Sequence, residues 1–302
     1  MSEQLLALPN EDPVAAPRAT RTVAWRGHAF AVARHGVVEE ALRMFCSEFE
    51  AGTRQFFDAV LPDCDNMIDV GAHVGLTTLY AAGRVGRVAA FEPSPVNFDF
   101  LTRNVALNPE LRPRISLFAE GLGDRDERVA LYAKAFGDSG SSIFQDVERA
   151  RVVRGAAVAT VPLRHAPTVL SEIGLSARTL IKIDIEGAEY RVVPAIADLL
   201  AETRPFLHLS FHPFNLLAGA DEYATTLLRL RRSLEIAAAL AHYRFMYFYV
   251  AGKWVCLESA NRMDFLRQYL LRPKPVERVG TPQYGFIDAV AFADENIQAL
   301  GG

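Results

Sequence analysis

Charged side chains interrupt an apolar stretch in LIKIDIEGAEY, residues 180–190. Lys182, Asp184 and Glu186 stand at every second position, and side chains in a β-strand alternate between its two faces. The three charges would therefore share one face. At the end of a buried strand, carboxylates beside an ammonium could accept a proton, bind a cation or orient a ligand, whereas on an antiparallel edge strand they would only face water. The neighbouring elements decide between these interpretations.

A second group of residues has the types and spacing that bind a nucleoside. Asp69 precedes Gly71 and Gly75 at a strand-to-helix turn, where the glycines let the backbone turn tightly and approach a ligand. Glu92 ends the next strand, where a carboxylate can accept two hydrogen bonds from a ribose diol. Asp124, after a third strand, is either a contact to the adenine edge or a turn residue in GDRDE. Because G-x-G-x-x-G and the lysine of a P-loop are absent, neither a dinucleotide nor a triphosphate is indicated.

The elements that carry these residues alternate between strand and helix. The strand-like stretches are NMIDVG, RVAAFEP, RISLFAEGLGD, TLIKIDIEG and RPFLHLSFHPF, and the helical stretches are GLTTLYAAG, SPVNFDFLTRNVALN and EYRVVPAIADLLAE. This order predicts an α/β fold with a mostly parallel sheet and helices on both faces. Ligands of such sheets lie beyond the carboxyl ends of the strands, so Asp184 and Glu186 should emerge there. Lys182 should be buried one step deeper and pair with a carboxylate of the same site.

The flanking segments predict a three-part organisation. Residues 1–19 form a disordered leader, residues 20–61 a small N-terminal cap, and residues 62–302 the main domain. The cap consists of two strands joined at Arg26–Gly27 and a helical stretch from residue 37 to 61 that breaks at Gly52. The main domain should also contain strands at 129–135 and 158–163 around the loop 137–142, a helix at 223–241, a hairpin across 251–252, and a last strand at 287–294.

Composition excludes several classes of protein. The 302 residues carry 32 basic and 36 acidic side chains, a formal charge of −4 without a basic stripe, which argues against nucleic acid as a partner. The three cysteines are widely spaced, so neither a disulfide framework nor a thiolate zinc site is indicated. A secretory signal and an uninterrupted apolar run of membrane-spanning length are both absent from the sequence. We therefore expect a cytoplasmic protein without a membrane span.

The sequence also resembles a known family. IDVGAHVG, FEPSPVNFDFLTRNVALN, EGLGD and LIKIDIEGAEY, in this order and spacing, are similar to the FkbM family of S-adenosylmethionine-dependent methyltransferases over roughly residues 48–215. The resemblance implies the class I methyltransferase (Rossmann-like) fold and S-adenosylmethionine as cofactor. It places Gly71, Ala72 and Gly75 near the methionine portion and Glu92 on the ribose. His73 stands where many class I methyltransferases have another glycine, and either packs or touches the ligand.

The function expected on this basis is transfer of a methyl group to a hydroxyl of a small molecule or glycan, of sugar or polyketide type. The hydroxyl would attack the sulfonium methyl in line, and a base would take its proton. Asp184 is the first candidate for the base, followed by Glu186 and His212. His212 could instead be a hydrogen-bonded loop residue, and His208 is expected to be structural. A divalent ion bound by Asp184 and Glu186 is a further arrangement, so the metal requirement stays open.

Two rival functions fit the same sheet. One is an NAD-linked dehydrogenase or epimerase, against which the missing third glycine of the dinucleotide motif argues. The other is a cofactor-binding partner subunit without catalysis. The acceptor pocket would be shaped by the cap and by the aromatic stretch FMYFYVAGKW, which could equally belong to the core or to the surface of a homodimer.

Overall fold

The computed structural model describes most of the chain, in the ranges 19–135, 137–147, 152–153, 156–219, 221–250, 252–258, 274–275, 282–283 and 289–300. The predicted leader lies outside these ranges apart from Ala19. Within them, none of the helices combines the length and the apolar character needed to cross a membrane.

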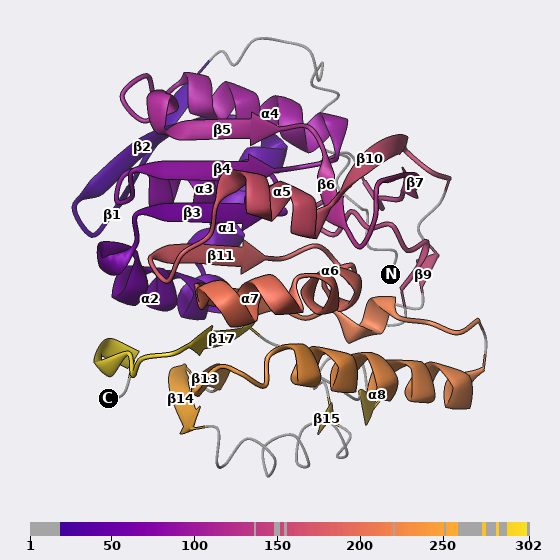
Figure 1. Cartoon of the computed structure of the whole chain (residues 1–302). Coiled ribbons are helices and arrows are strands. Elements are labelled where there is room, and N and C mark those ends of the chain that lie inside the picture. Colours follow the sequence, from indigo (N-terminus) through magenta and orange to yellow (C-terminus); the bar gives the residue numbers. More distant parts are fainter. Residues whose placement is uncertain are drawn as a thin grey trace.

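An eight-stranded sheet forms the centre of the molecule, in the order β14-β13-β17-β12-β11-β3-β4-β5 (Figure 1). Its strands are β3 (Asn66–Val70), β4 (Arg87–Phe91), β5 (Ile115–Phe118), β11 (Thr179–Ile183), β12 (Phe206–Ser210), β13 (Phe245–Val250), β14 (Lys253–Glu258) and β17 (Ala289–Ala293). The strands β5, β4, β3, β11 and β12 are parallel, and β17, β13 and β14 each pair antiparallel with their neighbour. The sheet confirms the predicted α/β fold. Its strand order reverses between β3 and β11, which is the switch point where such sheets bind ligands.

Helices cover both faces of this sheet. The helices α1 (Gly36–Cys46), α2 (Ala51–Val60), α3 (Leu76–Ala82) and α4 (Pro95–Ala106) share one core cluster with it. The helices α5 (Ala166–Ile173), α6 (Glu189–Ala195), α7 (Ala197–Thr203) and α8 (Glu222–Ala239) share the other, and Figure 1 shows α5 to α7 in front of the strands. Neighbouring strand residues enter opposite clusters, as Leu180 and Ile181 do, because strand side chains alternate.

The charged residues Lys182, Asp184 and Glu186 follow this alternation only in part. In β11, Lys182 lies on the side of α1 to α4, directly beside Asp69 of β3 and His208 of β12 in the register. The strand ends at Ile183. The backbone then turns through positive φ, +51° at Glu186, so Glu186 reaches the site from a turn. The prediction that one strand carries all three charges was therefore wrong at its end.

The N-terminal region begins with the predicted strand pair, β1 (Thr20–Trp25) and β2 (His28–Ala33), which are antiparallel. The expected break at Gly52 was wrong. The helical stretch is interrupted at Ser47–Glu50, where Ser47 Oγ donates to Met44 O (2.7 Å) and a short 3-10 turn, η1 (Glu48–Glu50), follows. Gly52 lies inside α2, and a Cβ there would come 2.7 Å from the Tyr249 ring. The glycine therefore allows β13 to pack against α2.

Two further predictions needed correction. The stretch 114–124 is two strands in different sheets, since β6 (Gly121–Gly123) pairs with β10 (Ala159–His165), which also pairs with β7 (Glu127–Leu131). A Cβ at Gly121 would come 2.7 Å from a terminal methyl of Leu163, so the glycine leaves room for this side chain where β6 approaches β10. The helix predicted after Gly187 is divided into α6 and α7 just beyond Pro194, which lacks a backbone N–H.

The remaining elements are short. They are η2 (Leu61–Asp63), η3 (Arg112–Arg114), β8 (Asp146–Val147), β9 (Val152–Val153), η4 (Pro213–Asn215), β15 (Lys274–Pro275), β16 (Pro282–Gln283) and η5 (Gln298–Leu300). The predicted hairpin corresponds to β13 and β14, and the predicted last strand to β17.

Candidate functional site

A cavity of about 520 Å³ lies beyond the carboxyl ends of β3, β11 and β12. It is lined by residues 71–74, Lys182 and Asp184 at the strand ends, and also by residues of α1, the start of α2, and Tyr249 of β13. The volume falls within the range of about 300–1,000 Å³ that small-molecule sites occupy. A ligand here would meet the N-terminal region on one side and the charged strand ends on the other.

A buried ion pair supports the base of this cavity. Lys182 Nζ donates to Asp69 Oδ1 (3.1 Å) and to the carbonyl oxygen of Gly71 (2.9 Å), and lies 4.0 Å from Asp184 Oδ2. The second Asp69 oxygen accepts two threonine hydroxyls of α3, each at 2.7 Å. Burial acts to lower the Lys182 pKa, but the charges of Asp69 and Asp184 outweigh it and raise the pKa above its ordinary value. The pairing predicted for Lys182 is confirmed, with Asp69 as the partner.

The turn after β3 is held tightly against the end of β11. Gly71 has φ +84°, and a Cβ there would come 1.9 Å from the carbonyl oxygen of Asp184, so only glycine fits. Gly75 has φ +87° and precedes α3. Ala72 lines the large cavity, and its N–H donates to Phe91 O (3.0 Å). The turn predicted from the glycine spacing is present.

Glu92 lies directly after β4, as expected, and its carboxylate is held by backbone donors. His73 N (2.8 Å) and Ser94 N (2.9 Å) each donate to one of its oxygens, and the residue is 6% exposed. Burial raises the pKa of Glu92 to about 7, against the lowering effect of the two N–H groups. Its side chain lines a second, narrow cavity of about 60 Å³. The two cavities share Gly71, His73 and Asp184 in their walls, so they adjoin at these residues.

Asn97 supplies an unsatisfied polar atom in the wall of the narrow cavity. Its side chain is 2% exposed, and its Nδ2 donates to the carbonyl oxygen of Asp138 (3.4 Å). Its Oδ1 is buried and has no hydrogen-bond partner among the described residues. Buried acceptors are normally satisfied, so this atom suits a ligand that donates a hydrogen bond. Asn97 Oδ1 and the Glu92 carboxylate therefore offer acceptor atoms to a ligand that carries hydrogen-bond donors.

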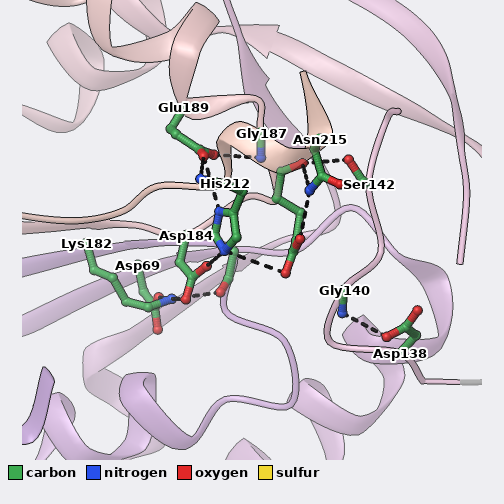
Figure 2. Close-up of polar contacts among 12 residues, drawn as sticks. Asp69, Asp138, Gly140, Ser142, Lys182, Asp184, Gly187, Glu189, His212 and Asn215 are labelled. Atoms are coloured by element: carbon green, nitrogen blue, oxygen red, sulfur yellow. Dashed lines mark hydrogen bonds and ion pairs between the residues drawn. The ribbon is translucent and has the colours of Figure 1, made fainter. Parts of the chain in front are cut away.

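His212 is surrounded by carboxylates at the other end of the large cavity (Figure 2). Its Nδ1 lies 3.1 Å from Glu189 Oε1, and its Nε2 lies 3.5 Å from Asp184 Oδ1 and 3.6 Å from Glu186 Oε1. Burial acts to lower the His212 pKa, but the charges of Glu186, Glu189 and Asp184 raise it to about 10. At neutral pH the ring is therefore a cation, which cannot accept a further proton. This geometry favours His212 as an orienting group over His212 as a base.

Asp184 and Glu186 differ in their electrostatic surroundings. Burial acts to raise the Asp184 pKa, but the charges of Lys182 and His212 lower it below its ordinary value. The Glu186 pKa is raised, mainly by burial. Asn215 Nδ2 donates to both the carbonyl oxygen and Oε2 of Glu186, each at 2.9 Å, which fixes the carboxylate toward the cavity. The site therefore contains one carboxylate that is held ionised and one that retains a proton more readily.

Residues of the loop at 137–144 line both cavities. His73 Nε2 lies 3.1 Å from the carbonyl oxygen of Gly137, and Ser142 Oγ donates to the carbonyl oxygen of Glu186 (2.6 Å). Burial lowers the His73 pKa, so the ring is neutral and donates to Gly137. His73, which the sequence left as either a packing residue or a ligand contact, thus anchors the loop and also lines both cavities.

Two residues considered from the sequence lie elsewhere. Asp124 is bonded to Arg191, with Nε at 3.0 Å, and is absent from the walls of both cavities. His208 is fully buried among the rings of Phe56, Phe57 and Trp254, and burial lowers its pKa to about 3. The sequence-based view of His208 as structural agrees with this packing.

Sequence reasoning missed four residues around these cavities: Glu50, Asn97, Glu189 and Asn215. Glu189 gave a weak signal, as an acidic residue directly before a predicted helix, but nothing linked it to His212. Asn97 lay unremarked within a predicted helix. Glu50 and Asn215 belong to short 3-10 turns, which leave no hydrophobic periodicity to detect.

The structure gives no support to a metal at this site. No group of three or more His, Cys, Asp or Glu side chains in the described part of the chain is arranged to hold an ion. Asp184 and Glu186, the residues considered as ligands if a metal is bound, face the His212 ring.

Comparison with known proteins adds a family match. Residues 69–248, more than half of the chain, match the family model described as Methyltransferase FkbM domain. Methyltransferase sdnD of Sordaria araneosa is 29% identical over 163 residues, which cover 46% of this chain and 62% of that protein, so the chain spans about three-fifths of its length. The AMB antimetabolite synthetase AmbE of Pseudomonas aeruginosa is 29% identical over 284 residues, covering 80% of this chain and 12% of that protein. The crystal structure of methyltransferase FkbM from Methylobacillus flagellatus KT shares 18% identity, with a TM-score of 0.42, over 76% of this chain and 44% of that chain.

Proposed function

The chain belongs to the FkbM methyltransferase family, and from this premise we propose that it transfers the methyl group of S-adenosylmethionine to a hydroxyl of a small molecule or glycan. The acceptor class, a sugar or polyketide type of hydroxyl, is part of the proposal. The observation that carries it is the junction of the two cavities. Glu92 and Asn97, whose acceptor atoms suit a nucleoside, line the narrow cavity. Gly71 and Asp184, at the ends of β3 and β11, line both cavities.

The residues present fit the nucleoside and the methionine portion of the cofactor separately. Glu92 would accept hydrogen bonds from the ribose hydroxyls, and Asn97 Oδ1 offers a buried acceptor for a donor of the nucleoside. The turn at Gly71 leads into the large cavity, where the methionine portion would lie. When bound, S-adenosylmethionine supplies an electrophilic methyl group on a positively charged sulfur.

The chain itself would contribute alignment, exclusion of water and a proton acceptor. The loop at 137–144 covers the cavities and is fixed to the strand ends through Ser142 and Glu186. Asp184 lies in the wall of both cavities, so a hydroxyl placed in the large cavity can bond to it. Lys182 and His212 hold Asp184 ionised and oriented.

We assign Asp184 as the group that accepts the acceptor's proton as the carbon–oxygen bond forms. Its lowered pKa makes it a modest base. Modest basicity is sufficient, because the hydroxyl becomes strongly acidic as it gains the methyl group. Glu186 is the second candidate because its raised pKa makes it the more basic of the two carboxylates.

Methyl transfer from radiolabelled S-adenosylmethionine into native extracts, followed by mass identification of the labelled product, tests the function directly. A product methylated at oxygen supports the proposal, and a product methylated at nitrogen or carbon contradicts the hydroxyl assignment. Saturable binding of the cofactor without any transfer would favour the rival of a partner subunit without catalysis. The family membership leaves the NAD-linked rival without support.

Asp184→Asn should lower the turnover number by about 10²- to 10⁴-fold, which is the usual contribution of a general base. The affinity for S-adenosylmethionine, measured by calorimetry, should change little because Asn keeps the shape of the side chain. Glu186→Gln is the matched comparison and should have the smaller effect. If the Gln variant loses more activity than the Asn variant, Glu186 is the base and Asp184 only orients the hydroxyl.

A further inference from the structure

Glu50 is a carboxylate of the large cavity that the proposed mechanism leaves unused. It is the last residue of η1 and precedes α2, and it lines the cavity together with Gly52 and Thr53. Burial raises its pKa and the nearby charge of Asp184 adds to this, whereas a hydrogen bond with Thr53 and the charges of Lys182 and Arg54 oppose it. Within the described ranges, Glu50 takes part in no ion pair.

The cations of the cavity are already shared by other carboxylates. Lys182 serves Asp69 and Asp184, and His212 serves Asp184, Glu186 and Glu189. Glu50 therefore faces the cavity as an acidic group that feels the charges of Lys182 and Arg54 but forms an ion pair with neither of them. A partly buried carboxyl group in this position favours a ligand that brings a positive charge.

The place of Glu50 along the crevice indicates which part of a ligand it would meet. Glu92 and the unsatisfied Oδ1 of Asn97 line the narrow cavity, whereas Glu50 lines only the large one. A cofactor whose nucleoside lies at Glu92 passes Gly71 and Asp184, which belong to both walls, and its amino-acid end enters the large cavity. That end carries an α-ammonium group.

We propose that Glu50 binds the α-ammonium group of the methionine portion of S-adenosylmethionine. The inference rests on the proposed function, because it presumes that this cofactor occupies the crevice. The Thr53 side chain orients the carboxyl group, and Gly52 lets Tyr249 close the wall behind it.

Two ligands with the same nucleoside separate this role from others. S-adenosylhomocysteine carries the amino-acid end, and 5′-methylthioadenosine lacks it. In Glu50→Gln, the dissociation constant of S-adenosylhomocysteine should rise about 10- to 100-fold, as expected for loss of a charged hydrogen bond. That of 5′-methylthioadenosine should stay within about twofold, since nothing of the nucleoside touches Glu50. Both constants can be measured by isothermal titration calorimetry.

Matched variants keep the experiment decisive. Glu48→Gln changes an exposed residue of the same turn and should leave both affinities unchanged. Glu50→Asp retains the charge and should restore part of the affinity for S-adenosylhomocysteine. This partial rescue would show that the loss in Glu50→Gln does not come from misfolding.

Three results would overturn the assignment. Unchanged binding of S-adenosylhomocysteine by Glu50→Gln would mean that Glu50 serves the acceptor or the fold. Equal weakening of both ligands would mean that the substitution disturbs the crevice as a whole. If the parent protein binds 5′-methylthioadenosine but not S-adenosylhomocysteine, the amino-acid end is not recognised at all. Failure of the proposed function can be told apart from these results. A parent protein that binds both ligands but transfers no methyl group would overturn only the proposed function, whereas one that binds neither ligand would overturn both proposals.

Discussion

The two ends of the crevice are built in different ways. At the narrow end, the carboxylate of Glu92 is held by backbone N–H groups of His73 and Ser94. At the wide end, Asp184 and Glu186 are held by side chains, those of Lys182, His212 and Asn215. Backbone donors are present whatever the side chain, whereas a side-chain partner can be lost by one substitution. The narrow end should therefore tolerate changes in its neighbours, and the wide end should be sensitive to them.

Among substitutions that test this contrast between the two ends, we expect the largest effect at Lys182. Lys182→Met leaves Asp69, which is fully buried, without its cation, and breaking a buried pair in this way costs about 3–5 kcal/mol. The free energy of unfolding, measured with denaturant, should fall by that amount. Lys134→Met, at an exposed lysine, is the control and should change it by less than about 0.5 kcal/mol. A loss below about 1 kcal/mol in the Lys182 variant would mean that the wide end does not depend on this pair.

His212 should give a smaller effect that depends on pH. Its pKa is raised from 6.5 to about 10 in the folded protein, so its protonated form stabilises the fold. That contribution is fully present below pH 6.5 and is lost as pH rises through about 10. The difference in free energy of unfolding between the parent and His212→Asn should be about 2 kcal/mol at pH 6 and shrink toward pH 10. His165→Asn, which changes a ring that bonds Thr168, is the control. A difference in free energy of unfolding between the parent and His212→Asn that does not vary with pH would contradict the assigned protonation of His212.

Glu92 should give the smallest effect, and it concerns ligand binding. Its pKa is raised from 4.5 to about 7, so stability without ligand falls as pH rises from 4.5 through 7. Ribose hydroxyls bond best to the ionised carboxylate, so affinity for 5′-methylthioadenosine should increase about tenfold from pH 6 to pH 8. Glu92→Gln should bind more weakly, with an affinity that does not vary over this range. Equal pH dependence in both proteins, or unchanged affinity in Glu92→Gln, would show that Glu92 does not hold the ribose.

The same contrast explains which parts of the site could be read from the sequence. Gly71 and Glu92 line the cavities as expected, because a strand-to-helix turn and the end of the next strand are short-range features with fixed residue types. Asp69, expected beside the cofactor, is instead fully buried and lines neither cavity. Lys182 was assigned a buried carboxylate partner from its position in an apolar strand, although the partner could not be named. Asp124 was chosen from its place after a strand, and the structure pairs it with Arg191 away from both cavities.

The wide end shows where sequence reasoning stopped. Glu189 and His212 are bonded across 23 positions, and Ser142 and Glu186 across 44. Glu50 reaches the same cavity from the N-terminal region, although neither its type nor its spacing distinguishes it from a surface residue. Contacts of this kind depend on how helices and loops pack on the sheet, so no local pattern reveals them.

The alternation of strands and helices, the glycine turn after β3 and the acidic residue after β4 follow from the amino-acid sequence alone, because backbone sterics and the period of apolar residues set them. The environment of the charges arises only when the chain folds. In the folded chain, β11 ends at Ile183, Glu186 turns through a positive φ, and His212 lies among three carboxylates. The physical reason is that burial and neighbouring charge fix the protonation of these groups, and both arise only when distant segments come together.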